Sequence, residues 1–139
     1  IRDSFANAHT DGDAAVFFRE ANVIHTGDIV FYGLYPFVDV DSGGSIDGII
    51  AACEVFLEEA DAETQIVVGH GPLIGRAELQ TYLEMMVEIR ARIAARIDAG
   101  DDLAAVQASR PTADWDETWG NTWLNGDQIT ELVYRSLKE

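Results

Sequence analysis

A short apolar segment between two amphipathic segments constrains the fold of this chain more than any other feature. Residues 65–68 (QIVV) form a compact, mostly apolar run, and segments with helical periodicity lie on both sides of it. In Ile46–Glu59, apolar residues recur at spacings of three and four behind Ser45, a residue type that commonly caps a helix N-terminus. The same spacing continues through Arg76–Asp98 until Gly100, which is typical of a helix end. A buried strand between two helices predicts an α/β layer with helices on at least one face of a sheet.

The N-terminal region predicts further strands. Ala14–Phe18 and Asn22–Ile24 are short apolar runs separated by a polar turn, so we expect a hairpin or two adjacent strands there. Asp28–Phe37 is apolar and aromatic but contains Gly33 and Pro36, which favours a loop with extended pieces. Together with residues 65–68, the two apolar runs supply the strands of the expected sheet.

The C-terminal region predicts short helices after the long one. Asp101 and Asp102 are suited to cap a helix that ends near Ala108. Pro111 then acts as a breaker, and a last helix is expected over Gln128–Leu137. The length of 139 residues fits one domain, so we expect a single domain over residues 1–139 with a helical extension over about 101–139.

The tryptophans of this region are spaced by four residues, at Trp115, Trp119 and Trp123. Helical spacing would stack them on one face. Gly120 and Asn121 interrupt helix propensity, which favours an irregular part within the stretch. We interpret the tryptophans as core or subunit packing, with a substrate-lining role as the less supported alternative.

The charge balance excludes two classes of partner. The chain has 25 acidic and 9 basic residues, a formal net charge of −16, and Lys138 is its only lysine. A field this negative repels nucleic-acid phosphates and anionic lipid surfaces, so neither nucleic acid nor a membrane is expected as a partner. No stretch approaches the ~18 apolar residues of a membrane span. The acidity fits either a solvated acidic face or adaptation to high salt.

The cysteine content and the N-terminal sequence favour one cellular location for the protein. Cys53 is the single cysteine, so no disulfide can form within the chain, and its place in a helical run predicts a buried packing role. The sequence begins with Ile1-Arg2-Asp3 and shows no signal peptide. These features favour a cytoplasmic protein. A periplasmic or secreted location stays open, because the sequence begins without Met and an N-terminal part could have been removed.

Metal-capable side chains stand beside glycines in short segments next to apolar runs. The segments are AHTDGD with His9, HTGD with Asp28 and GHGP with His70. Each lies on a predicted strand-end loop, where rigid strands can aim a side chain into a shared cleft. Imidazoles and carboxylates are ligands for a hydrolytic zinc ion, which lowers the pKa of bound water to about 7. Taken singly, each segment is a weak signal.

The order of the segments resembles the C-terminal part of the metallo-β-lactamase superfamily of metal-dependent hydrolases. The resemblance runs from about His9 to Gly100, and more loosely to the end of the chain. It implies the C-terminal half of an αβ/βα sandwich, with His9, Asp28 and His70 as metal ligands. Asp28 would bridge two metals, while each histidine completes one site. The implied metal is zinc, although iron or manganese also suits a His/Asp set.

Residues around these ligands have predicted supporting roles. We expect His25 to be structural or to contact a ligand rather than the metal. Asp11 and Asp13 flank His9; one could orient an imidazole through its second nitrogen, or Asp13 could hold the loop through backbone amides. Tyr35 and Phe37 could line a substrate cleft, or their rings could cover the core.

The resemblance also has a gap. The leading His-x-His-x-Asp-His motif of the superfamily is missing from these 139 residues, whose three histidines are dispersed. Two functions follow as alternatives. One is activated-water hydrolysis of a small-molecule ester, thioester, lactam or phosphoester, weak or absent in this partial chain. The other is a non-catalytic half-domain that self-associates or binds a complementing N-terminal half.

Overall fold

The computed structural model describes residues 2–139 and contains a four-stranded sheet in the order β1-β2-β3-β4. The strands are β1 (Arg2–Phe5), β2 (Asp13–Phe18), β3 (Val23–His25) and β4 (Gln65–Val67). β1, β2 and β3 pair antiparallel, and β4 joins β3 in parallel. A parallel pair needs a long crossover, and the helix between β3 and β4 provides it.

The helices follow the periodic segments of the sequence. They are α1 (Ile46–Glu59), α2 (Arg76–Asp98), α3 (Leu103–Ala108), α4 (Ala113–Trp119) and α5 (Gly126–Lys138), with short 3-10 turns at Gly27–Ile29 and Val40–Ser42. The Ser45 hydroxyl accepts the backbone N–H of Gly48 at 2.9 Å, which caps the first turn of α1. Asp102 caps α3 in the same way through the N–H of Ala105.

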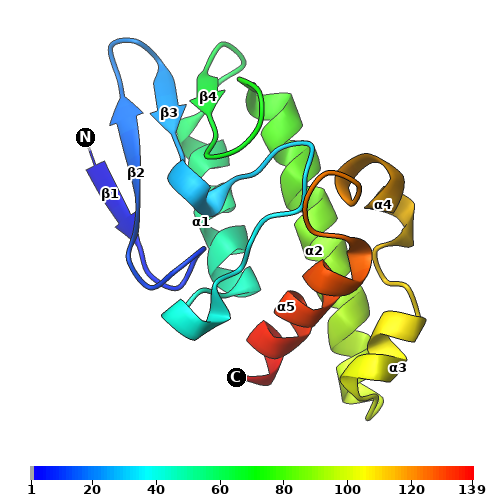
Figure 1. Cartoon of the computed structure of the whole chain (residues 1–139). Coiled ribbons are helices and arrows are strands. Elements are labelled where there is room, and N and C mark those ends of the chain that lie inside the picture. The colour runs from blue at the N-terminus through cyan, green and yellow to red at the C-terminus, as the bar shows by residue number, and fades with distance from the viewer. Residues whose placement is uncertain (1) are drawn as a thin grey trace.

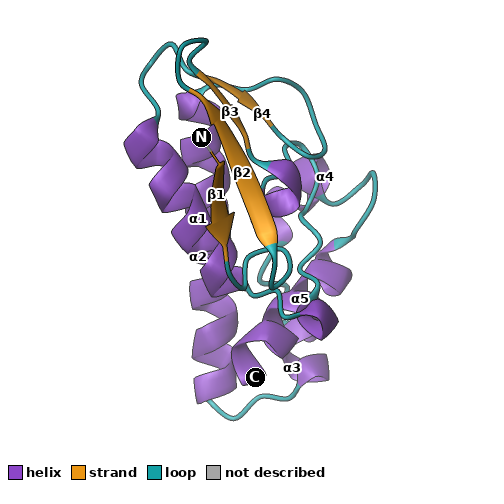
Figure 2. Cartoon of the chain, turned by 90° about the vertical axis from the view of Figure 1, so that its left-hand side faces the viewer, coloured by secondary structure: helices purple, strands orange, loops and turns teal. Residues whose placement is uncertain are grey.

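The main core lies between the sheet and the helices behind it (Figures 1 and 2). Phe56 of α1 is fully buried, and its ring lies 5.2 Å from that of Phe5 and 6.2 Å from that of Phe17, measured between centroids. Ile24 and Ile66 are register partners on the same buried face. α2 packs against α1 and α5, which extends the core away from the sheet.

The opposite face of the sheet carries less cover. Figure 2 shows the strands in front, with α1 and α2 behind them. Paired residues lie on the same face, so Phe18 shares this face with its partner Val23. The Phe18 side chain is 51% exposed, which is unusual for a phenylalanine in a strand.

Most of the elements predicted from the sequence are confirmed. The bounds of α1 and α2 agree with the periodic segments, and the predicted hairpin is formed by β2 and β3. β1 and α4 were not predicted, because Arg2–Phe5 is too polar to stand out as a strand. The irregular part expected at Gly120 and Asn121 is confirmed, since α4 ends at Trp119 and Trp123 lies on the following loop, off the helix that contains Trp115 and Trp119. The mixed α/β class itself is confirmed.

The described residues include no helix that is both long and apolar enough to cross a membrane.

The acidic surface predicts a salt-dependent stability. The carboxylates outnumber the basic residues by 16, so the folded chain repels itself. Raising ionic strength from 0.1 M to 1 M shortens the Debye length from about 10 Å to about 3 Å. We expect the thermal unfolding midpoint to rise over this range in a NaCl series followed by circular dichroism. A midpoint that is highest at low salt would contradict this expectation and the high-salt interpretation of the composition.

Candidate metal centre

Asp28 and His70 come together at the carboxyl ends of two parallel strands. Asp28 lies in the 3-10 turn after β3, and His70 lies on the loop after β4. His70 Nε2 is 3.4 Å from Asp28 Oδ1. Both side chains are accessible, at 54% and 45% exposure respectively. The two segments meet because parallel strands deliver their following loops to the same edge of the sheet.

Backbone contacts hold the two loops in register. The N–H of Gly69 donates to the carbonyl of Val30 at 3.1 Å, and the N–H of Tyr32 donates to the carbonyl of His70 at 2.9 Å. A Cβ on Gly69 would lie 2.3 Å from Asp28 Oδ1, so only glycine permits this approach. Gly71 has φ +129°, a conformation that L side chains rarely adopt. The glycines on both sides of His70 therefore have a steric cause.

His9 lies on the β1–β2 loop and is not part of this pair. Its ring centroid is 6.5 Å from that of Phe31, and the His70 centroid is 4.6 Å from the same ring. Both histidines thus contact the aromatic ring of Phe31. Across residues 2–139, no group of three or more His, Cys, Asp or Glu side chains is close enough to hold a metal ion. The structure therefore brings Asp28 and His70 together, whereas His9 is not part of that pair.

The geometry of the Asp28–His70 pair fits two corners of a metal site. Zinc binds histidine nitrogen at about 2.0–2.1 Å and carboxylate oxygen at about 2.0–2.2 Å, so tetrahedral ligands lie about 3.4 Å apart. The observed Nε2–Oδ1 distance of 3.4 Å agrees with that separation. The two residues therefore fit a metal, but they supply too few donors to enclose one.

Asp13 combines the two roles predicted for the residues that flank His9. Its carboxylate accepts the backbone N–H of Thr10 at 2.7 Å, which holds the loop. The same group lies 3.5 Å from His9 Nδ1, within ion-pair distance, so it is placed to orient the ring. Asp11 is exposed and contacts the neighbouring turn through its N–H, which donates to the carbonyl of Ser42.

His25 stabilises the turn that carries Asp28. Its Nδ1 accepts the backbone N–H of Gly27 at 3.1 Å, and the side chain faces solvent at the end of β3. The contact reaches Gly27, the residue before Asp28, and does not join His25 to His70. This position agrees with a structural role rather than with that of a ligand.

Tyr35 is buried and does not border an accessible cleft. Its hydroxyl donates to Asp116 Oδ1 at 2.9 Å and lies 3.3 Å from the carbonyl oxygen of Thr112. Burial and the neighbouring Asp116 carboxylate raise the pKa of Tyr35, so the hydroxyl stays protonated and remains a donor. Phe37 is half-buried, with its ring centroid 6.1 Å from that of His9, and therefore borders the candidate site.

The Tyr35 hydroxyl predicts a measurable contribution to stability. Tyr35→Phe removes the donor and leaves the partly buried Asp116 carboxylate without that hydrogen bond, which costs about 1–3 kcal/mol of unfolding free energy. Urea denaturation of the two proteins measures the difference. Tyr134→Phe, at a half-buried position on α5 that contacts Lys138, is the matched control and is expected to change stability less. Equal losses in the two variants would contradict the role of the Asp116 bond.

Two residues at this edge were not predicted from the sequence. Phe31 is fully buried beside both histidine rings, and Trp123 stacks on it with a centroid distance of 5.5 Å and an interplanar angle of 13°. Trp123 is also 6.1 Å from the His70 ring and is 49% exposed. Sequence spacing gave no signal for this contact, because Trp123 and Phe31 lie far apart along the chain.

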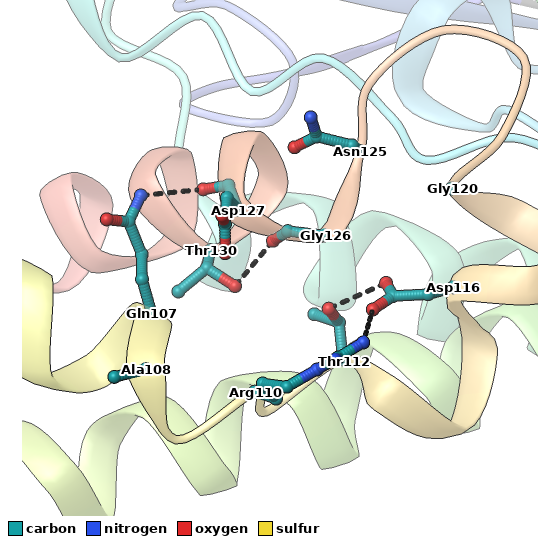
Figure 3. A pocket seen from close by; sticks show the side chains of 10 residues that line it. All are labelled: Gln107, Ala108, Arg110, Thr112, Asp116, Gly120, Asn125, Gly126, Asp127 and Thr130. Atoms are coloured by element: carbon teal, nitrogen blue, oxygen red, sulfur yellow. Dashed lines mark hydrogen bonds and ion pairs between the residues drawn. The ribbon is translucent and has the colours of Figure 1, made fainter.

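A polar cavity of about 470 Å³ lies elsewhere, between α3, α4 and α5 (Figure 3). Arg110 is 3.9 Å from Asp116 across it, and Thr112 donates to the same carboxylate at 2.8 Å. The cavity shares no residue with the Asp28–His70 edge. Of its two acidic residues, Asp116 is already paired with Tyr35, Thr112 and Arg110, which indicates a structural network.

No family model matches the sequence, and no curated protein matches it. Two solved structures share the fold over 96% of the chain: a double mutant of the sec-alkyl sulfatase PisA1 (TM-score 0.72, 16% identity) and the stereoselective inverting sec-alkylsulfatase Pisa1 from Pseudomonas sp. (TM-score 0.69, 15% identity). The chain covers 23% of each of them. A third structure, TTHA1623 in a di-iron-bound form, matches 55% of the chain and 37% of its own length with a TM-score of 0.46 and 23% identity.

The alkylsulfatases have the metallo-β-lactamase fold. At these identities the likeness establishes the fold, and the predicted metallo-β-lactamase-like α/β architecture is therefore confirmed. The chain spans about a quarter of the length of the alkylsulfatases that it matches.

Proposed function

We propose that this chain supplies part of the metal centre of a metal-dependent hydrolase. The observation that supports the proposal best is the Asp28–His70 pair, whose 3.4 Å spacing suits two ligands of one metal at a sheet edge. The resemblance of the His9, Asp28 and His70 segments to the metallo-β-lactamase superfamily also supports a metal centre. Because this chain spans 23% of its alkylsulfatase neighbours, we propose that the remaining ligands come from an N-terminal half of the fold.

The roles of the chain's own residues follow from their positions. His70 binds through Nε2, the nitrogen that faces Asp28, and the Asp28 carboxylate has a second oxygen with which to span two cations. His9, held through Nδ1 by Asp13, is the third proposed ligand and presents Nε2. A bound metal would polarise the reacting bond and make water acidic enough to attack it at neutral pH.

The substrate proposed for this centre is a small molecule with a hydrolysable bond: an ester, thioester, lactam or phosphoester. Sulfate esters belong to the same group, since the structural neighbours are sec-alkylsulfatases. The metal is proposed to be zinc, with iron or manganese as alternatives that a His/Asp donor set also accepts. With three of the proposed ligands in the chain, we expect weak metal affinity and little turnover from these residues alone.

Metal titration tests the assignment directly. Loss of an outer partner of a ligand costs about 10–100-fold in metal affinity, so loss of a ligand itself is expected to cost at least about tenfold. We expect His70→Ala and Asp28→Asn to weaken zinc binding by that factor in isothermal titration calorimetry. His25→Ala is the control for loss of a histidine; because His25 contacts only the turn backbone, we expect a smaller loss of zinc affinity than in His70→Ala. Equal zinc affinity for the wild type and His70→Ala would remove His70 from the site.

A second candidate function is a half-domain that associates through the open face of its sheet. The observation that supports it is the half-exposed side chain of Phe18. Phe18 lies beside its register partner Val23 on the face of the sheet that α1 and α2 do not cover. An exposed aromatic side chain on an uncovered sheet face is a contact that a partner or a second copy could bury. We expect multi-angle light scattering to detect dimers that form with rising concentration and that Phe18→Ser abolishes. A strictly monomeric wild type would rule out self-association.

A further inference from the structure

We infer that Trp123 is a specificity-determining residue of the candidate centre, and that its exposed ring binds an aryl or extended apolar group attached to the reacting bond. The inference rests on the proposed function, because it takes the Asp28–His70 edge as the place of reaction. It assigns a substrate class to that edge: molecules with a flat or extended hydrocarbon group next to the hydrolysed bond.

The Trp123 ring lies next to His70 at the Asp28–His70 edge. Its centroid lies 6.1 Å from that of His70, 6.1 Å from that of Phe37 and 5.5 Å from that of Phe31. The rings of Phe31 and Phe37 lie nearly parallel to it, at 13° and 28°. Stacking on Phe31 and Phe37 supports the indole, while 49% of Trp123 stays accessible to solvent. The result is an apolar surface next to a metal-capable imidazole.

The loop that carries Trp123 is held at both ends. At its start, the carbonyl of Trp119 accepts the backbone N–H of Tyr35 at 3.1 Å. At its end, Asn125 caps α5 by accepting the N–H of Gln128 at 2.9 Å. A Cβ on Gly126 would lie 2.5 Å from Asp116 Oδ1, so the start of α5 is packed directly on that carboxylate. Because both ends are fixed, the indole is held against Phe31 rather than moving freely in solvent.

The stacked geometry selects the chemistry of the ligand. An aromatic cage for a cation surrounds the charge with several ring faces, whereas Phe31 and Phe37 stack on Trp123, and Trp123 is the most exposed of the three rings. One exposed indole favours offset stacking with another ring or contact with an alkyl chain. The separation of 6.1 Å between the Trp123 and His70 centroids lets the first ring or first few carbons beside the reacting bond reach the indole.

A pair of zinc-binding probes tests the inference. Acetohydroxamate and benzohydroxamate share the metal-binding group and differ in the aryl ring. We expect benzohydroxamate to bind the zinc-loaded chain about three- to tenfold more tightly, as one aromatic contact allows. In Trp123→Ala the ratio of the two affinities is expected to fall close to one, and in Trp123→Phe most of it is expected to persist. Trp115→Ala is the matched control, since Trp115 contacts Arg92 on another part of the surface.

The outcomes separate the two proposals. Zinc binding with a benzohydroxamate preference that survives Trp123→Ala would overturn the role of Trp123 and leave the metal centre intact. Absence of zinc binding, measured before either probe is added, would overturn the proposed function and this inference with it. A preference lost in Trp123→Ala, kept in Trp123→Phe and kept in Trp115→Ala would establish Trp123 as the specificity surface.

Discussion

Phe56→Ala is expected to lower the free energy of unfolding by about 3–5 kcal/mol, the usual cost of removing a buried aromatic side chain. Phe56 is fully buried and joins α1 to the sheet through the rings of Phe5 and Phe17. Alanine leaves a cavity between the two layers, which can collapse only partly. Because domains have about 5–15 kcal/mol of stability, the loss removes a large share of it. Urea denaturation followed by circular dichroism measures the change.

Phe18→Ala is the matched control for Phe56→Ala. It deletes the same side chain from a strand position that is 51% exposed, so we expect a change below about 1 kcal/mol. A similar loss in both variants would show that the open face of the sheet is covered in solution. That result would contradict an uncovered face and favour self-association through it, as the second candidate function expects.

Gly69→Ala is expected to destabilise the loop of His70 and to weaken the candidate metal site together. The new Cβ would lie 2.3 Å from Asp28 Oδ1 and 2.7 Å from the carbonyl oxygen of Gly27. Asp28 can turn its side chain away, but the backbone oxygen can move only if the turn shifts. Overpacking of this kind costs about 1–3 kcal/mol. We also expect zinc affinity to fall at least about tenfold, because a proposed ligand is displaced.

Gly12→Ala provides the comparison for Gly69→Ala. A Cβ at Gly12 meets no atom within 4 Å, and Gly12 is not among the glycines with a positive φ. Its substitution is therefore expected to leave stability unchanged or to raise it by about 0.4–1 kcal/mol through the unfolded chain. Zinc affinity that stays at the wild-type value in Gly69→Ala would contradict the close packing of Gly69 on Asp28.

The helices were predictable because their signals are local. Ser45 accepts the N–H of a residue three positions along, and apolar residues at helical spacing mark the buried side of α1 and α2. β1 was not predictable in this way, because its strand state depends on pairing with β2 and not on its own composition. Trp123 shows the same limit, since its regular spacing from Trp119 continues past the end of α4.

The candidate site was predictable in its residue types and only partly in its geometry. Asp28 and His70 were expected on strand-end loops that share a cleft, and the structure places their side chains 3.4 Å apart. Asp13 contacts both the Thr10 backbone and the His9 ring, so its position agrees with both expected alternatives. Both histidine rings lie beside Phe31, a buried ring whose position no spacing rule indicates. Tyr35 is a structural anchor for α4, because its hydroxyl reaches an aspartate that lies far along the chain.

By itself, the sequence determined the α/β class, the extent of the two long helices and the segments that carry metal-capable side chains. Those properties depend on periodicity, capping and turn residues, which act over a few neighbouring positions. Only the tertiary structure decided that Asp28 and His70 stand 3.4 Å apart, that Phe31 lies beside His9, and that Trp123 borders the same edge. Those distances depend on how the strands and loops pack against one another, because the residues that they join are remote in sequence.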